Sequence, residues 1–308
     1  MNTNGLNYAT AGSDARIHEI LDASDQGYEE VDTIPSVNRL TYTNGFYVNR
    51  CTAIFIDIRG SSQLAQSHTR PVLGKLYRAY LSECVAILNQ DPNCKQIFIN
   101  GDCVSGMFDG NLAADVDSAV YRVGQLNAML NILNWRLAQR GYQTIQCGMG
   151  IDYGRALMLK AGFSGSGIND VIWLGDVVNN ASNLCHQGNK NGLKPIQIST
   201  AVYNKASRQD YKALMVAITG GLFGVVGYQG NFVSMEMSNW LETELASSRM
   251  SGLGRGIALI SGGIGQISGG IGTNALGGLG QLITQMHEMN RPRSTPSDIA
   301  KLLYPDQK

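Results

Sequence analysis

Two aspartates stand where the sequence predicts the ends of β-strands. Asp57 ends the apolar run of residues 52–56, which is typical of a buried strand. Asp102 lies in an Asn-Gly-Asp turn between two apolar runs, a pattern that predicts a hairpin. Hard cations such as Mg²⁺ take oxygen ligands and often only one or two carboxylates. The pair could therefore bind metal, whereas the simpler alternatives are a helix N-cap for Asp57 and an ordinary turn residue for Asp102.

The segment after Asp57 has the composition of a loop that leads into a helix. Residues 58–62 read Ile-Arg-Gly-Ser-Ser, with small and capping side chains. Backbone N–H groups at a helix N-terminus can bind phosphate oxygens. A metal pair beside such a loop is suited to phosphoryl-type transfer, in which charge on phosphate must be neutralised.

The apolar pattern predicts the elements that would position these residues. The predicted helices follow Pro71, carry residues 120–137, and run from Asp176 through Leu184. The predicted strands are 52–57, 96–99, 103–108, 145–151, 156–160 and 171–174, with a turn at 152–154. The order β-α-β-β-α-β predicts an α+β sandwich with helices on one sheet face.

Two flanking regions differ from this central domain, which we place at residues 49–240. Residues 1–48 form a lead-in with a short helix at 15–21 and an extended segment at 40–48. Residues 241–308 form a glycine-rich tail, in which 260–266 recur almost unchanged as 267–273. The tail could be a flexible linker or a small-residue packing helix in a membrane or oligomer. Its many glycines and polar residues favour a mobile or self-associating tail.

The composition excludes several classes of protein. Lys plus Arg and Asp plus Glu each number 24, and this zero net charge argues against general nucleic-acid binding. The six cysteines form no C-x-x-C pair, so a zinc site is not expected. The polar N-terminus has no apolar signal segment, which predicts a cytoplasmic protein.

Four ordered motifs resemble those of the class III adenylate and guanylate cyclases. They are F-x-D-I-x-G-S at 55–61, N-G-D at 100–102 with G-x-F at 106–108, G-x-G-I-x-x-G at 148–154, and L-G-D-x-V-N-x-A-S-x-L at 174–184. The resemblance implies a homodimer of palm-like, ferredoxin-like βαββαβ domains. It also implies a pair of Mg²⁺ or Mn²⁺ ions at Asp57, Ile58 and Asp102, with the interface helix of the other subunit completing each site.

The sequence departs from that family at the residues that read a purine. Phe98 and Ile172 replace the family's polar base readers, and Asn183 replaces its transition-state arginine, while Asn179 is retained. Arg155 and Arg59 are candidates to compensate for the missing arginine. The resemblance thus implies catalytic residues Asn179, Asn183 and Arg155. It implies substrate-binding residues Phe55, Arg59, Gly60, Ser61, Phe98 and Ile172, although Phe98 could equally be an ordinary core aromatic.

This combination resembles the pyrimidine cyclases of bacterial Pycsar antiphage defence. Members of that branch make cyclic UMP or cyclic CMP, which activates a separate effector. The resemblance implies UTP as the first expected substrate and CTP as the second, with the purine nucleotides excluded. The alternative is a catalytically inactive cyclase-like module that binds nucleotide or acts as a scaffold. Loss of the family arginine favours that alternative, whereas retention of both aspartates opposes it.

Overall fold

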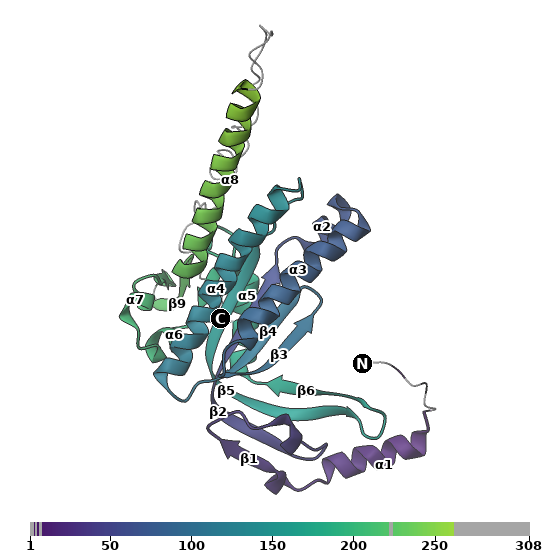
Figure 1. Cartoon of the computed structure of the whole chain (residues 1–308). Helices are drawn as coiled ribbons and strands as arrows, with labels where there is room; N and C mark the ends of the chain where they lie inside the picture. Colours follow the sequence, from purple (N-terminus) through teal and green to yellow (C-terminus); the bar gives the residue numbers. More distant parts are fainter. Residues whose placement is uncertain (1–2, 4, 6–7, 222–223, 262–308) are drawn as a thin grey trace.

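The computed structural model describes residues 3, 5, 8–221 and 224–261, with side chains up to residue 248. A mixed sheet forms the centre of the molecule, with strand order β3-β4-β2-β5-β7-β9-β8, β1 beside β2 and β6 beside β5 (Figure 1). The strands are β1 (Tyr28–Val31), β2 (Gly45–Ile58), β3 (Cys94–Asn100), β4 (Cys103–Asp109), β5 (Cys147–Phe163), β6 (Ile168–Leu174), β7 (Ile196–Ile198), β8 (Val216–Thr219) and β9 (Val225–Gly230).

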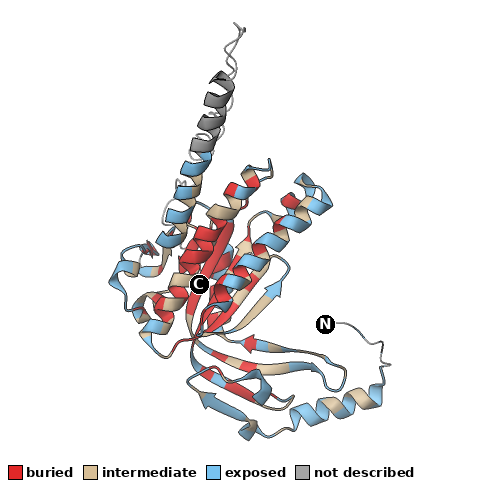
Figure 2. Cartoon of the chain, in the orientation of Figure 1, coloured by how far each residue is buried: buried red, intermediate tan, exposed pale blue. Residues whose placement is uncertain are grey.

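Helices cover both faces of this sheet. They are α1 (Thr10–Leu21), α2 (Ser61–Ser67), α3 (Arg70–Asn89), α4 (Ala113–Ala138), α5 (Asp176–Gln187), α6 (Thr200–Lys205), α7 (Gln209–Lys212) and α8 (Met235–Ser261). Buried residues concentrate where α4 lies against the sheet (Figure 2). The predicted α+β architecture is confirmed.

The two sheet faces carry separate cores because side chains alternate along β2. Ile54, Ile56 and Ile58 face α3 and α4. Ala53 belongs to a second core, the α5-side core, made of Ile34, Leu40, Phe46, Val48, Cys51, Ala53, Met107, Ala156, Met158, Trp173, Val177 and Ala181. The prediction that helices lie on one face was therefore wrong, since α5 packs on the other.

Glycines on β5 explain how α5 reaches that face. A Cβ at Gly150 would overlap the backbone of α5 at Ala181 and Cys185, and one at Gly148 would overlap the Cys185 carbonyl. Glycine at alternate positions of a strand therefore lets a helix backbone lie directly on the sheet.

The predicted turn at residues 152–154 was also wrong. Strand β5 continues without a break, and Asp152 and Gly154 pair with Ala53 and Cys51 of β2. The Asp152 side chain is buried and takes hydrogen bonds from Ser199 and the Tyr153 backbone. Turn-forming residue types are outweighed here because β2 is long enough to pair with β5 on both sides of this segment.

The flanking regions join the domain without a gap. The boundary predicted at residues 48/49 lies inside β2, and that at 240/241 lies inside α8. Trp240 of α8 meets Trp135 of α4 edge to face, with ring centroids 6.3 Å apart. Most of the predicted glycine-rich tail, residues 262–308, lies outside the described residues. Among the helices described, none is long and apolar enough to span a membrane.

Candidate active site

The two aspartates predicted to bind metal lie at one edge of the sheet. Ile56 of β2 pairs with Val104 of β4, which brings Asp57 level with the turn that holds Asp102. The turn is tight because Gly101 adopts a left-handed conformation with φ of 64°. Asp57 follows Phe55 on the α5 side of the sheet, so its carboxylate points away from the core beneath α3 and α4.

The charges of this pair are only partly compensated. Burial, followed by the nearby Asp102 carboxylate, raises the pKa of Asp57, and the Arg59 guanidinium opposes both effects. Asp102 has one carboxylate oxygen, Oδ2, that is enclosed and has no hydrogen-bond partner in the described part of the chain. An enclosed oxygen without a donor, beside a second carboxylate, suits a divalent cation.

The rest of the donor set is sparse. Within the residues the structure describes, His, Cys, Asp and Glu side chains form no group of three or more that could hold a metal. The Ile58 side chain is buried under α3 and α4, so only its backbone could take part. Two carboxylates fit Mg²⁺ or Mn²⁺, because such ions complete their shells with water and substrate phosphate oxygens.

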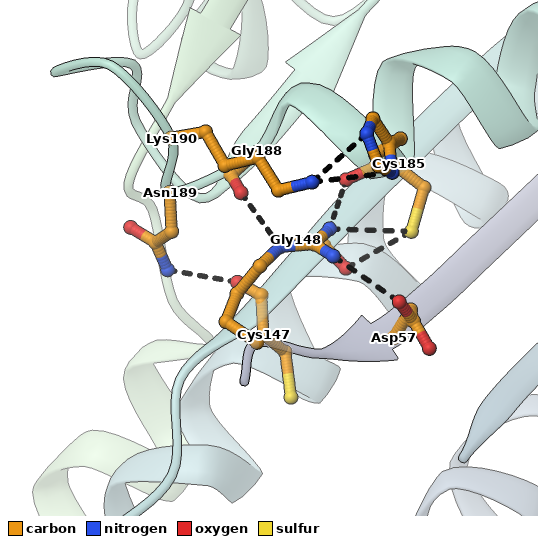
Figure 3. Close-up of polar contacts among 9 residues, drawn as sticks. Asp57, Cys147, Gly148, Cys185, Gly188, Asn189 and Lys190 are labelled. Carbon is orange, nitrogen blue, oxygen red and sulfur yellow. Dashed lines mark hydrogen bonds and ion pairs between the residues drawn. The ribbon is translucent and has the colours of Figure 1, made fainter. Parts of the chain in front are cut away.

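Arg59 lies against α5 rather than in the open site. Its Nη1 donates to Asp57 Oδ2 at 3.1 Å, and its Nε donates to the Gly188 carbonyl at 2.9 Å. Its Nη2 donates to the carbonyl of Cys185 (Figure 3). Gly148 leaves the space for this guanidinium, since a Cβ there would overlap it. The structure therefore places Arg59 as a link between the Asp57 carboxylate and the end of α5, which the sequence did not predict.

A second cation stands nearby. Lys190 Nζ lies 2.9 Å from Nε2 and 3.2 Å from Nδ1 of His186. Burial and then the Arg59 charge lower the pKa of Lys190. Burial, followed by the Lys190 charge, lowers the pKa of His186, which keeps its ring neutral at neutral pH. The sequence carried no signal for Lys190, because its loop approaches Asp57 only in the folded chain.

The loop predicted to bind phosphate offers fewer backbone N–H groups than expected. The backbone N–H of Arg59 donates to the Gln146 carbonyl at 2.7 Å, so it is already used. Gly60 caps α2 in a left-handed conformation, and Ser61 and Ser62 form the first turn of that helix. First-turn N–H groups have no partner within their helix. The Ser61 side chain shares a hydrogen bond with Tyr77 of α3.

The three residues predicted to be catalytic have exposed side chains. Asn179 and Asn183 are exposed on α5, while Val177 and Ala181 hold that helix against the sheet. Arg155 is exposed on β5. The described chain does not gather these three residues around the aspartates.

The predicted base readers are only partly brought together. Phe98 and Phe55 pack against the edge of the α5-side core. Ile172 is 37% exposed and lies on the other side of β6 from Trp173, because successive residues alternate. Trp173 occupies the Phe98 side, where its indole Nε1 donates to Gln96 Oε1. Neither Gln96 nor Trp173 was singled out from the sequence.

Two curated relatives decide the family. A uridylate cyclase from Gulbenkiania mobilis is 42% identical over 243 residues, which are 74% of this chain and 93% of that protein. A uridylate cyclase from Treponema porcinum is 34% identical over 210 residues, covering 68% of this chain and 72% of that protein. The chain belongs to the uridylate cyclase family. No protein-family model matches it.

Solved structures carry the same fold. An adenylyl cyclase from P. aeruginosa superposes with a TM-score of 0.50 at 23% identity, covering 61% of this chain and 95% of that one. A class III adenylyl cyclase-like ATP-binding protein from Pseudomonas aeruginosa gives 0.54 at 18% identity, covering 74% of this chain and 48% of that one. The uridylate cyclase family member described here therefore has a class III cyclase fold.

Proposed function

We propose that this nucleotide cyclase converts UTP into 3′,5′-cyclic UMP and pyrophosphate. The observation that carries the proposal is the convergence of Asp57 with Asp102, whose buried oxygen lacks a donor in the described residues. The uridylate cyclase relatives support UTP as the substrate, with CTP as the second choice.

The reaction is an intramolecular displacement at the α-phosphorus. The ribose 3′-oxygen forms a bond to this phosphorus and gives up its proton to solvent water. The bond to the oxygen that bridges the α- and β-phosphorus breaks, and pyrophosphate leaves with the electron pair. Bound Mg²⁺ or Mn²⁺ would neutralise phosphate charge and lower the pKa of the attacking hydroxyl.

The residues of the chain would hold the reacting groups. Asp57 and Asp102 would bind the metal ions, with Arg59 holding Asp57 from the side of α5. The N–H groups of Ser61 and Ser62 have no backbone acceptor among the described residues and would donate to the triphosphate. Phe98 would form an apolar wall for the base, whose single ring needs less room than a purine.

We also propose that the active enzyme is a homodimer with composite sites. The exposed positions of Asn179 and Asn183 on α5 support this, because polar side chains on an outward helix face can reach a site on another subunit. Asn179 would then act on substrate bound at the Asp57 of its partner.

The resemblance to antiphage cyclases supports a cytoplasmic signalling role, in which the cyclic nucleotide activates a separate effector. All six cysteines are free, as suits a reducing compartment. Burial raises the thiol pKa to about 12 in five of them, namely Cys51, Cys84, Cys94, Cys103 and Cys185.

An inactive nucleotide-binding module is the second candidate, favoured by Asn183 in place of the family arginine. Against it, a binding module has no need to hold two repelling carboxylates together. The test is incubation with each of the four ribonucleoside triphosphates and Mn²⁺ or Mg²⁺, for wild type and for Asp57→Ala and Asp102→Ala. Cyclic UMP from wild type alone is expected. Near wild-type turnover by either variant would refute the metal assignment, and no product with any nucleotide would favour the inactive module.

A further inference from the structure

A polar pair interrupts the apolar wall beside Phe98. Gln96 pairs with Met107 of β4, a member of the α5-side core, so its side chain lies on that face of the sheet. Phe98 follows two residues later on the same face, about 7 Å along the strand. Trp173 of β6 is 8% exposed and donates its indole N–H to Oε1, the side-chain amide oxygen of Gln96. An amide is thus held beside the aromatic ring predicted to receive the base.

The indole determines which way this amide points. An indole nitrogen can only donate, so the oxygen of the Gln96 amide must face Trp173. The amide NH₂ group must then point away from Trp173. The nitrogen of this group, Nε2, is not one of the enclosed side-chain atoms that lack a hydrogen-bond partner. It also has no hydrogen-bond acceptor among the described residues. Gln96 therefore offers a fixed donor that a ligand can use.

Uracil and cytosine differ at the position such a donor would test. Uracil carries a carbonyl oxygen at C4, which accepts a hydrogen bond. Cytosine carries an amino group there, which would place two donors face to face. A site built to donate rejects the analogue that cannot accept, because the site's polar group loses its partner.

We propose that Gln96, oriented by Trp173, is the residue that selects uracil over cytosine by donating an amide N–H to O4 of the base. This inference rests on the proposed function and adds a residue and an atom to it. Gln96 would touch the substrate, whereas Trp173 acts only through Gln96 and is a positioning residue.

The test is the ratio of kcat/KM for UTP to that for CTP. Gln96→Glu keeps the length of the side chain and an oxygen for the indole, but its second oxygen accepts and would favour the cytosine amino group. We expect the ratio to fall by about 10- to 100-fold, the effect of exchanging a paired for an unpaired polar group. Gln96→Met should lower both rates and bring the ratio close to one.

Trp173→Phe separates positioning from packing. It keeps an aromatic ring in the core but frees the amide to turn, so the ratio should fall although Gln96 is intact. Gln139→Glu is the matched control. Gln139 is exposed at the C-terminal end of α4, and its side-chain oxygen accepts a hydrogen bond from Arg136 at 3.3 Å. The substitution adds the same negative charge there and should leave the ratio unchanged.

The outcomes separate this inference from the proposed function. A wild-type enzyme that cyclises UTP, with an unchanged ratio in Gln96→Glu, overturns the role of Gln96 alone. An unchanged ratio in Trp173→Phe overturns the positioning role. If a Gln96 variant does not fold, as judged by circular dichroism, Trp173→Phe still decides. If wild type turns over no nucleotide, the proposed function fails. The selection of uracil is then tested by calorimetric titration with non-hydrolysable UTP and CTP analogues, and the ratio of their binding affinities takes the place of the kcat/KM ratio.

Discussion

Replacing Arg59 by methionine should destabilise the fold and change the pH dependence of activity. Arg59 is 11% exposed and donates to Asp57, which is 32% exposed, and to two carbonyls at the end of α5. Removing one partner of a buried ion pair costs about 3–5 kcal/mol. Because water can reach Asp57 and screens the pair, we expect a smaller cost than that range, about 2–3 kcal/mol.

The expected change in pH dependence has a definite sign. Burial and the Asp102 carboxylate already raise the pKa of Asp57, and Arg59 counteracts them. Without Arg59 this pKa rises further, so the carboxylate is protonated at a higher pH and releases metal earlier as the pH falls. The acid limb of the activity profile, measured at subsaturating Mn²⁺, should therefore move to higher pH.

Two companion variants divide these effects. Arg59→Lys keeps a positive charge near Asp57 but loses the forked contacts of the guanidinium. Its acid limb should therefore lie closer to that of wild type than the acid limb of Arg59→Met, while part of the loss in stability remains. Arg122→Met breaks a comparably buried pair, in which Arg122 is 14% and Asp91 0% exposed, far from the aspartate pair. Urea unfolding should show a lower free energy of unfolding for Arg122→Met, whereas the acid limb of its activity profile should not shift. An activity profile of Arg59→Met that superposes on that of wild type would refute the effect of Arg59 on the pKa of Asp57.

Substitutions at Phe98, Asn179 and Asp91 test the base pocket, the composite site and a buried ion pair. Phe98→Ala should enlarge the base pocket and admit some ATP at a cost in UTP turnover, measured as relative kcat/KM; unchanged rejection of ATP would argue against a steric wall. Mixed Asp57→Ala and Asn179→Ala subunits should regain part of the activity, since one heterodimer site is intact, and demonstrated heterodimers without activity would contradict composite sites. Burial opposes ionisation of Asp91, but hydrogen bonds from Ser118 and Arg122 outweigh it and lower the pKa. Asp91→Asn should therefore cost about 3 kcal/mol at neutral pH in urea unfolding. This difference should shrink as the pH falls below about 4 and through the lower pKa that Asp91 has in the folded state.

The parts of the fold that local sequence encodes were predictable. The hairpin around Asp102 follows from turn-forming residues between two apolar runs, and the helix after Gly175 follows from its apolar spacing. The placement of that helix on the opposite sheet face was missed. It depends on Gly148 and Gly150, whose alternate spacing on one strand is the signal that could have indicated it.

The parts of the site that depend on long-range contacts were not predictable. Arg59 was expected at the substrate, but its partners Cys185 and Gly188 lie more than a hundred residues away in the chain. The contact between Gln96 and Trp173 likewise joins strands that are 77 residues apart in sequence. No local pattern reports such contacts, because they exist only in the folded chain.

We propose that this nucleotide cyclase prefers UTP to the other three ribonucleoside triphosphates. The most direct test is a competition in one vessel, with wild-type enzyme, Mn²⁺ and equal concentrations of UTP, CTP, ATP and GTP. The products are separated by chromatography and identified by mass. Cyclic UMP as the main product, with pyrophosphate in equal amount, is the predicted result. Cyclic AMP or cyclic GMP as the main product, or equal amounts of all four, would contradict the account.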